Sequence, residues 1–265
     1  EEQDERLGTA HAIGLARTHV KGDFLSVNGD VVVSTNAMRG LLEFHKKVGT
    51  TVMAVAEVPN PSAFGVVELN GDRVVALEEK PKSPRSNLIN AGVYIFSDGI
   101  FELIDKTPKS SRGEYEITDT IRALMKAEDV HGYRLPDPWI DVGRPWDLLA
   151  ANEILMRGIK GRIEGEVARG AHLSGEVVVE PGAEVLDGAY VKGPTIIGRD
   201  SEVGPNCYVR PSTTIGRGCK VGNACEVKNS ILMDGTHVPH QNYIGDSILG
   251  ERCNLGAGTK VANLR

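Results

Sequence analysis

A six-residue period between Ala183 and Val227 is the feature that most constrains how this chain can fold. The residue two places before each member of the repeat is small, as at Ala183 and Ser201. A period of six fits neither an α-helix nor an isolated strand. It predicts a parallel β-helix, in which short strands stack coil on coil around a narrow core. The aliphatic members of the repeat are Val185, Val191, Ile197, Val203, Val209, Ile215, Val221 and Val227.

Three basic residues, Lys192, Arg210 and Lys228, each follow a member of the repeat at intervals of 18 residues. If three hexads make one coil, as in the left-handed β-helices that this repeat resembles, the three side chains form a column. Successive coils lie roughly 4.8 Å apart. Cations this close repel one another unless an anion lies against them, so the column predicts a phosphate site. A row of solvated charges is the alternative.

Composition limits the class of protein. The length of 265 residues allows two domains, and 40% hydrophobic with 25% charged residues is typical of soluble globular proteins. The net charge of -6 argues against nucleic acid as a partner, and no apolar segment is long enough to span a membrane. We therefore expect a soluble, cytoplasmic protein without a nucleic-acid or membrane partner.

The cysteines are expected to be free thiols in a reducing compartment, because all four fall in the small-residue position of the repeat and pack there. No C-x-x-C pair is present, which argues against a zinc site. The four are Cys207, Cys219, Cys225 and Cys253.

Upstream of the repeat, alternating helices and strands predict an α/β domain. Thr9 is placed to cap a helix that begins there. Residues 24–30 are expected to form a buried parallel strand that ends at Asp30, where α/β sheets place ligands. Other expected elements are a helix at 36–48, strands at 50–58 and 90–96, and a hairpin at 65–77 that turns at Asn70-Gly71.

Six motifs in this region occur in order: LGTAHA, Gly29-Asp30, Phe64-Gly65, EEKP, NAGVY and WIDVG. Together they resemble the sugar-1-phosphate nucleotidylyltransferases over residues 1 to about 157. In that family a sugar phosphate attacks the α-phosphate of a nucleoside triphosphate and releases pyrophosphate, and Mg²⁺ neutralises charge. The resemblance implies an incomplete Rossmann-like domain at 1–157, followed by a linker at 158–161.

The resemblance also implies roles for individual residues. Asp30 and Asp141 would bind Mg²⁺, and Gly8 and Thr9 would contact the base. The family's Gly-rich phosphate loop does not precede Leu7, so we expect this chain alone to transfer nucleotides poorly. The glutamates of the GEYEITD segment at 113–119 would either contact the sugar or cap a helix. The expected sugar-phosphate contacts are Gly65, Glu78 or Glu79, Lys80 and Asn90.

The period slips after Val227 and resumes at Leu249, so residues 229–243 are predicted to leave the β-helix as a functional loop. This region resembles the acetyltransferase half of the bifunctional N-acetylglucosamine-1-phosphate uridylyltransferase/glucosamine-1-phosphate acetyltransferases. The resemblance implies a left-handed β-helix acyltransferase domain at 162–265, trimeric, with active sites between subunits. The matched positions are Arg210, Glu226, Lys228, His240, Tyr243 and Asn254.

The chemistry of acetyl transfer suggests what these positions do. An amine must lose a proton to attack a thioester, and His240 titrates in a suitable range for that base. Glu226 is a candidate to orient His240. Sugar phosphate would be held by Arg210 and Lys228, and the sugar by Tyr243 and Asn254. The backbone around Ala257 would contact acetyl-CoA.

The first hypothesis is thus a bifunctional enzyme that makes UDP-N-acetylglucosamine from glucosamine 1-phosphate, acetyl-CoA and UTP, as a homotrimer or dimer of trimers. One alternative is a nucleotidylyltransferase for glucose or mannose 1-phosphate whose β-helix is regulatory or oligomerising. Another is a catalytically silent assembly subunit. A zinc lyase with His237 and His240 as ligands is disfavoured, because a third histidine would have to converge with them.

Overall fold

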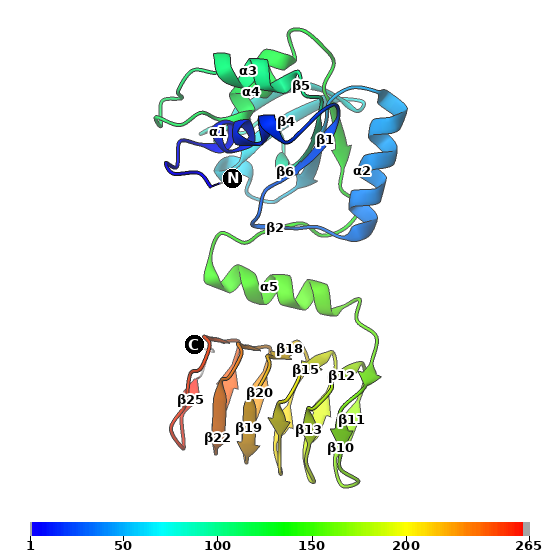
Figure 1. Ribbon diagram of the computed structural model, residues 1–265, viewed down its shortest axis with the longest axis vertical. Coiled ribbons are helices and arrows are strands. Elements are labelled where there is room, and N and C mark those ends of the chain that lie inside the picture. Colours follow the sequence, from blue (N-terminus) through cyan, green and yellow to red (C-terminus); the bar gives the residue numbers. More distant parts are fainter. Residues whose placement is uncertain (1, 262–265) are drawn as a thin grey trace. The chain divides into compact units, whose positions relative to one another are not determined.

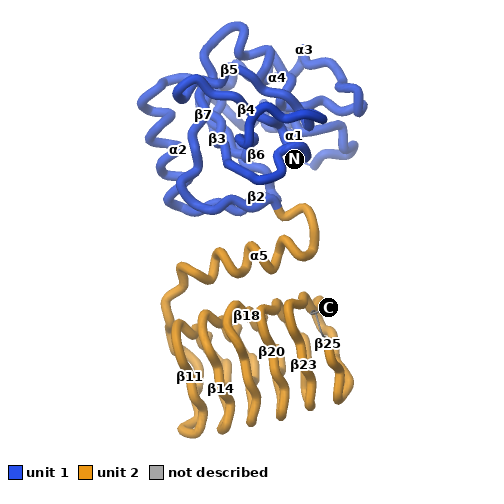
Figure 2. Tube along the Cα trace, turned by 180° about the vertical axis from the view of Figure 1, so that it is seen from behind, with its two compact units in different colours: residues 1–141 blue, residues 142–265 orange. Residues whose placement is uncertain are grey.

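The computed structural model describes residues 2–261 (Figure 1). The chain forms two compact units, residues 1–141 and 142–265 (Figure 2). The expected linker at 158–161 follows helix α5 (Pro145–Met156), whereas the units divide before that helix. Polar contacts join α5 to the β-helix: Asn152 Nδ2 donates to the Ser212 carbonyl at 3.0 Å, and Thr214 Oγ1 donates to Asn152 Oδ1 at 2.6 Å.

Unit 1 contains a mixed six-stranded sheet with the order β1-β6-β3-β7-β5-β4. β1 pairs antiparallel with β6, so the prediction that Asp30 follows a parallel strand is wrong. Among the described strands of this sheet, β3 and β7 form the parallel pair. The strands are β1 (Phe24–Val27), β3 (Val52–Glu57), β4 (Gly65–Asn70), β5 (Arg73–Glu79), β6 (Leu88–Phe96) and β7 (His131–Arg134), and β2 (Val31–Val32) pairs separately with β8 (Ile140–Asp141).

Helices cover both faces of this sheet, which explains why strand β3 is apolar and buried from Val52 to Ala56. Successive side chains of a strand point to opposite faces. Met53 of β3 therefore packs in a core with α1, α3 and α4, while Val52 packs in a second core with Leu41 of α2. The helices are α1 (Thr9–Gly14), α2 (Thr35–Val48), α3 (Ile100–Lys106) and α4 (Ile117–Leu124), with short 3₁₀ turns at Leu15–Thr18 and Pro61–Ala63. None of the helices within residues 2–261 combines the length and the apolar composition of a membrane-spanning segment.

After α5, unit 2 is a parallel β-helix with three faces, each a sheet of parallel strands. The first face contains β10 (Glu166–Val167), β13 (Glu184–Val185), β16 (Glu202–Val203), β19 (Lys220–Asn223) and β22 (His237–His240). The second contains β11 (His172–Ser174), β14 (Tyr190–Lys192), β17 (Tyr208–Val209), β20 (Glu226–Lys228), β23 (Tyr243–Gly245) and β25 (Lys260–Val261). The third contains β9 (Arg162–Ile163), β12 (Val177–Val179), β15 (Thr195–Ile197), β18 (Thr213–Ile215), β21 (Ile231–Leu232) and β24 (Ile248–Leu249).

The predicted repeat forms the core of this β-helix. Its aliphatic members from Val185 to Val227 are buried, and so are the small residues two places before them. All four cysteines are free thiols, and three of them are buried. Cys253 is exposed, so its predicted packing role is wrong. It lies in the last coil of the described residues, which no further described coil covers.

The prediction that residues 229–243 leave the β-helix as a loop is wrong, because these residues continue all three of its faces. Val203 pairs with Val221 at an interval of 18 residues, whereas Val221 pairs with Val238 at 17. One residue is missing at the corner after Lys228, where Asn229 turns the chain with a φ of 43°. A deletion of one residue shifts the period without interrupting the fold.

Shortening a core side chain should test this arrangement. Ile215→Ala should lower the free energy of unfolding of the β-helix by about 2–5 kcal/mol, because Ile215 is fully buried and its loss leaves a cavity. Chemical denaturation followed by circular dichroism measures the change. The matched variant is Ile163→Ala, at a side chain that is 51% exposed. It should cost less than about 0.5 kcal/mol, and equal losses for the two variants would contradict the core assignment.

Candidate functional sites

A cavity of about 350 Å³ opens in unit 1 beside β4, β5 and β6. It is lined by six residues that the sequence predicted as ligand contacts: Thr9, Gly65, Glu79, Lys80, Asn90 and Asp141. Sequence reasoning gave no role to other lining residues, among them Asn28, Tyr94, Arg112 and Thr118. Residues that are far apart in the sequence thus meet around one polar cavity, as a ligand site requires.

The structure decides between the two glutamates of the EEKP motif. Neighbouring residues of a strand point to opposite faces. Glu79 lines the cavity, whereas Glu78 lines a separate hollow with Arg85 and Arg122. Burial raises the pKa of Glu79, and the nearby Glu116 carboxylate raises it further. Of the two glutamates, Glu79 is therefore the candidate for binding a sugar.

The backbone of the cavity wall depends on two unusual positions. Lys80 has a positive φ of 44°, and its amide donates to the Phe64 carbonyl at 3.0 Å. At Gly65, an added Cβ would lie 3.1 Å from Thr118 Cγ2 and 3.2 Å from Glu79 Oε2. A side chain at Gly65 would therefore crowd the cavity.

Asn90 makes contacts inside the wall. Its Nδ2 donates to the Tyr94 hydroxyl oxygen at 2.7 Å, and its Oδ1 accepts from the Gly92 amide at 3.1 Å. Tyr94 is buried, and this burial raises the pKa of its hydroxyl group. These bonds fix the orientation of the Asn90 side chain where it lines the cavity.

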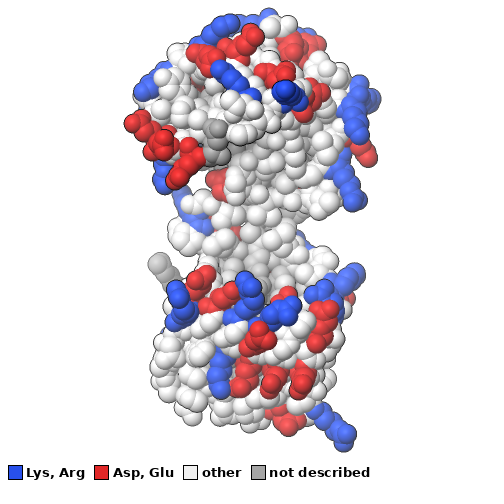
Figure 3. Space-filling view, viewed as in Figure 1, with Lys and Arg blue, Asp and Glu red and all other residues white. Residues whose placement is uncertain are grey.

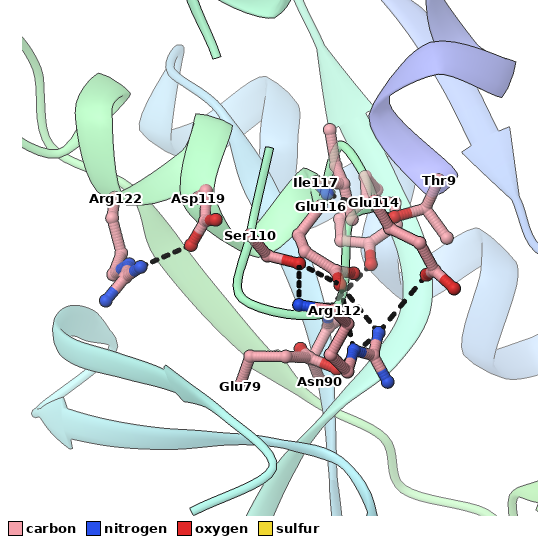
Figure 4. A network of polar contacts seen from close by, with 11 residues as sticks. Thr9, Glu79, Asn90, Ser110, Arg112, Glu114, Glu116, Ile117, Asp119 and Arg122 are labelled. Atoms are coloured by element: carbon pink, nitrogen blue, oxygen red, sulfur yellow. Dashed lines mark hydrogen bonds and ion pairs between the residues drawn. The ribbon is translucent and has the colours of Figure 1, made fainter. Parts of the chain in front are cut away.

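Arg112 joins three carboxylates at one side of the cavity (Figure 4). Its guanidinium lies 2.6 Å from Glu116, 3.3 Å from Glu114 and 3.9 Å from Glu79. Both glutamates of the 113–119 segment, Glu114 and Glu116, line the cavity.

Helix α4 is capped by a residue from another helix. The Glu116 side chain makes no capping bond to α4. The cap comes from Thr9, whose Oγ1 accepts from the Ile117 amide at 3.0 Å. Thr9 was expected to cap its own helix, and that prediction is wrong.

The two predicted magnesium ligands lie close together in the fold. Asp141 lines the cavity, and Asp30 lines an adjoining hollow along β1 that shares Thr9 and Asn28 with the cavity. Val31 pairs with Asp141, which places Asp30 next to that pair along the backbone. Within residues 2–261 there is no cluster of three or more His, Cys, Asp or Glu side chains arranged for a metal ion.

On the β-helix, the predicted basic column lies in register on the second face. Val191, Val209 and Val227 pair in successive coils, so Lys192, Arg210 and Lys228 follow equivalent positions. The column is partly neutralised, because Arg210 bonds Glu226 at 2.9 Å and Lys228 bonds Asp246 at 3.0 Å. Acidic and basic side chains both occur on the side of this unit that Figure 3 shows.

Asp246 is the main partner of Lys228. Burial opposes its ionisation, but hydrogen bonds from Asn229 and Lys228 prevail and lower the pKa of the carboxyl group. Asn229 Nδ2 donates to Asp246 at 2.7 Å. The ion pair between Lys228 and Asp246 forms a fixed, charged corner of the second face. Lys192 occupies the equivalent position two coils away and is exposed.

The remaining acetyl-site candidates occupy two faces. Tyr243 lies beside Glu226 on the second face, whereas His240 ends β22 on the first face. The His240 ring is exposed and forms no hydrogen bond to any residue between 2 and 261. Glu226 pairs with Arg210, so within one chain it does not orient His240. Asn254 and Ala257 are exposed near β22: Asn254 bridges to His237, and the Gly258 amide donates to the His240 carbonyl at 3.2 Å.

A Rossmann-like unit with a carboxylate-lined cavity, followed by a parallel β-helix, defines the architecture of a nucleotidyltransferase. The family model described as "Nucleotidyl transferase" matches residues 1–158. The chain therefore belongs to the nucleotidyl transferase family. A second model, described as "GMPPB C-terminal domain", matches residues 191–265 of the β-helix.

Individual relatives cover both units. The chain is 47% identical over its whole length to "Bifunctional protein GlmU" of Methanocaldococcus jannaschii, and it spans 64% of that relative's length. It is 40% identical over 79% of its length to a "Bifunctional sugar-1-phosphate nucleotidylyltransferase/acetyltransferase" of Sulfurisphaera tokodaii, of which it covers 53%. A solved structure from Bacillus anthracis, described as a putative glucose-1-phosphate thymidylyltransferase, is also similar. The match covers 60% of this chain and 65% of the chain in that structure, with a TM-score of 0.53 and 29% sequence identity.

Proposed function

We propose that the protein containing this chain makes UDP-N-acetylglucosamine by two reactions. Its β-helix transfers an acetyl group from acetyl-CoA to glucosamine 1-phosphate, and unit 1 transfers a uridylyl group from UTP to the product. The observation that supports this most is that one chain contains both the Glu79–Lys80 cavity and the basic column. Similarity to a relative named for nucleotidyl and acetyl transfer extends over both units.

In nucleotidyl transfer, the sugar phosphate would lie in the cavity, with Lys80 against its phosphate and Glu79 accepting hydrogen bonds from sugar hydroxyl groups. Gly8 and Thr9 would contact the base. Asp30 and Asp141 fit a magnesium ion, because they are neighbours in the fold and Mg²⁺ prefers carboxylate and phosphate oxygens. The bound ion would neutralise phosphate charge as the transition state forms.

In acetyl transfer, His240 would take a proton from the amino group while Arg210 and Lys228 bind the phosphate. Tyr243 and Asn254 would contact the sugar, and the backbone near Ala257 would contact acetyl-CoA. Because Glu226 is engaged by Arg210 and the His240 ring is exposed, we infer that a neighbouring subunit completes this site in a cytoplasmic homotrimer or dimer of trimers.

The proposal is tested by product formation. The whole protein, given glucosamine 1-phosphate, acetyl-CoA, UTP and Mg²⁺, should produce UDP-N-acetylglucosamine, free CoA and pyrophosphate, each quantified by chromatography. Formation of pyrophosphate from a sugar phosphate and a nucleotide without any CoA release would reject the bifunctional assignment.

A second candidate is a nucleotidylyltransferase for another sugar phosphate whose β-helix regulates or assembles the protein. It is favoured by the match of the β-helix to the GMPPB C-terminal domain and by the lack of a hydrogen bond from the His240 ring to any described residue. This candidate predicts pyrophosphate release with glucose or mannose 1-phosphate and no acetylation.

Removal of one cation should weaken acetyl-acceptor binding. Lys228→Ala should raise the KM for glucosamine 1-phosphate in the acetyl transfer assay by about 10- to 150-fold, since a charge-assisted hydrogen bond contributes roughly 1.5–3 kcal/mol. Lys192→Ala is the matched control, because Lys192 lies in the same column but two coils away and is exposed. Equal KM changes in the two variants would indicate a diffuse charge effect and contradict a specific phosphate contact.

A further inference from the structure

Two segments that are distant in the sequence are bonded together beside the cavity of unit 1. The Tyr115 amide donates to the Leu7 carbonyl at 2.8 Å, and the Ala10 amide donates to the Tyr115 carbonyl at 2.9 Å. Between these bonds, Gly8 has a φ of 114° and approaches so closely that an added Cβ would lie 2.5 Å from the Tyr115 oxygen. Residues 7–10 and 115 therefore form one hydrogen-bonded unit.

The Thr9 hydroxyl extends this unit to α4. Its Oγ1 accepts from the amide of Ile117, the first residue of α4, at 3.0 Å (Figure 4). The first amides of a helix have no partner within the helix, so the side chain that accepts from them fixes the first turn. α4 has no cap from its own N-cap residue, Glu116.

The first turn of α4 forms the carboxylate side of the cavity. Glu116 and Thr118 both line it, and the Glu116 carboxylate binds the Arg112 guanidinium at 2.6 Å. Thr118 lies against Gly65, and Thr118 and Glu79 both line the cavity. A movement of this turn would displace groups on the Glu79 side, where the sugar is proposed to bind.

We propose that Thr9 is a positioning residue that couples the nucleotide and sugar-phosphate subsites through its bond to Ile117. The inference rests on the proposed function, in which Gly8 and Thr9 lie against the base. A bound base holds residues 7–10 in place, the Thr9 hydroxyl passes this restraint to α4, and Glu116 and Thr118 are then set to receive the sugar phosphate. Each ligand consequently raises the affinity of the other by the same factor.

The test is a measurement of binding to the whole protein by calorimetry. The affinity for N-acetylglucosamine 1-phosphate is determined without nucleotide and with a saturating non-hydrolysable UTP analogue. In the parent protein the analogue should raise this affinity by about fivefold or more. Thr9→Val has nearly the same shape without the hydroxyl, and it should reduce the factor to near one, whereas Thr9→Ser should retain it.

The outcomes are distinguishable. A purely structural role for Thr9 would lower the melting temperature of Thr9→Val and leave the coupling factor unchanged, which would overturn the inference. A parent protein that binds both ligands without coupling would overturn it too. A parent protein that binds neither ligand would refute the proposed function itself. If Thr9→Val does not fold, Thr9→Ala gives the same comparison, because it also lacks the hydroxyl group and alanine is favoured in helices.

Discussion

Asp30→Ala in the whole protein should lower the rate of nucleotidyl transfer by about 10³-fold or more, with acetyl transfer unchanged. Asp30 follows β1 and lies next to the Val31–Asp141 backbone pair, in a hollow that adjoins the cavity. Charge neutralisation by a bound metal stabilises a transition state by several kcal/mol, and about 1.4 kcal/mol corresponds to a factor of ten. Pyrophosphate release under saturating UTP and Mg²⁺ measures the rate.

The control for this experiment is Asp72→Ala. Asp72 is an exposed carboxylate at the turn between β4 and β5, outside the lining of the cavity, so its loss should leave the rate within about twofold of the parent. Magnesium-dependent pyrophosphate release at the parent rate from Asp30→Ala would show that the metal site has been misplaced.

His240→Ala should slow acetyl transfer by about 10²–10⁴-fold, the usual contribution of a positioned general base. The side chain is exposed at the end of β22, and it makes no hydrogen bond to the described residues that a truncation would break. The fold should therefore be retained, and a loss of rate would report chemistry. Release of CoA from acetyl-CoA in the presence of glucosamine 1-phosphate is the assay.

His237→Ala provides a matched comparison, because His237 lies on the same strand, is also exposed and is the same residue type. It should acetylate at close to the parent rate. If His240→Ala behaves like His237→Ala, the β-helix is structural and the second candidate function is favoured.

The β-helix was predictable because its period fixes which residues face the core. Val203, Val221 and the other aliphatic members of the repeat all point inward because each coil repeats the same turn geometry. The prediction failed at residues 229–243, where one missing residue at Asn229 shifts the period. Leu232, Val238 and Ile244 continue the core there, and a search that allowed coils of 17 residues would have found them.

The cavity was only partly predictable. Glu79, Lys80 and Asn90 belong to motifs with a recognisable local sequence, and the structure brings them together. Arg112 has no such signal, because its role depends on contacts with Glu79 and Glu116 that only the folded chain creates. The partner of Thr9 was missed for the same reason, since Ile117 is 108 residues away.

The central claim is that two units of one protein perform two independent reactions. The most direct test measures pyrophosphate release and CoA release separately on Asp30→Ala and His240→Ala of the whole protein. We predict that Asp30→Ala loses only pyrophosphate release and that His240→Ala loses only CoA release. A fall of both activities together in either variant, or acetylation at the parent rate by His240→Ala, would contradict the account.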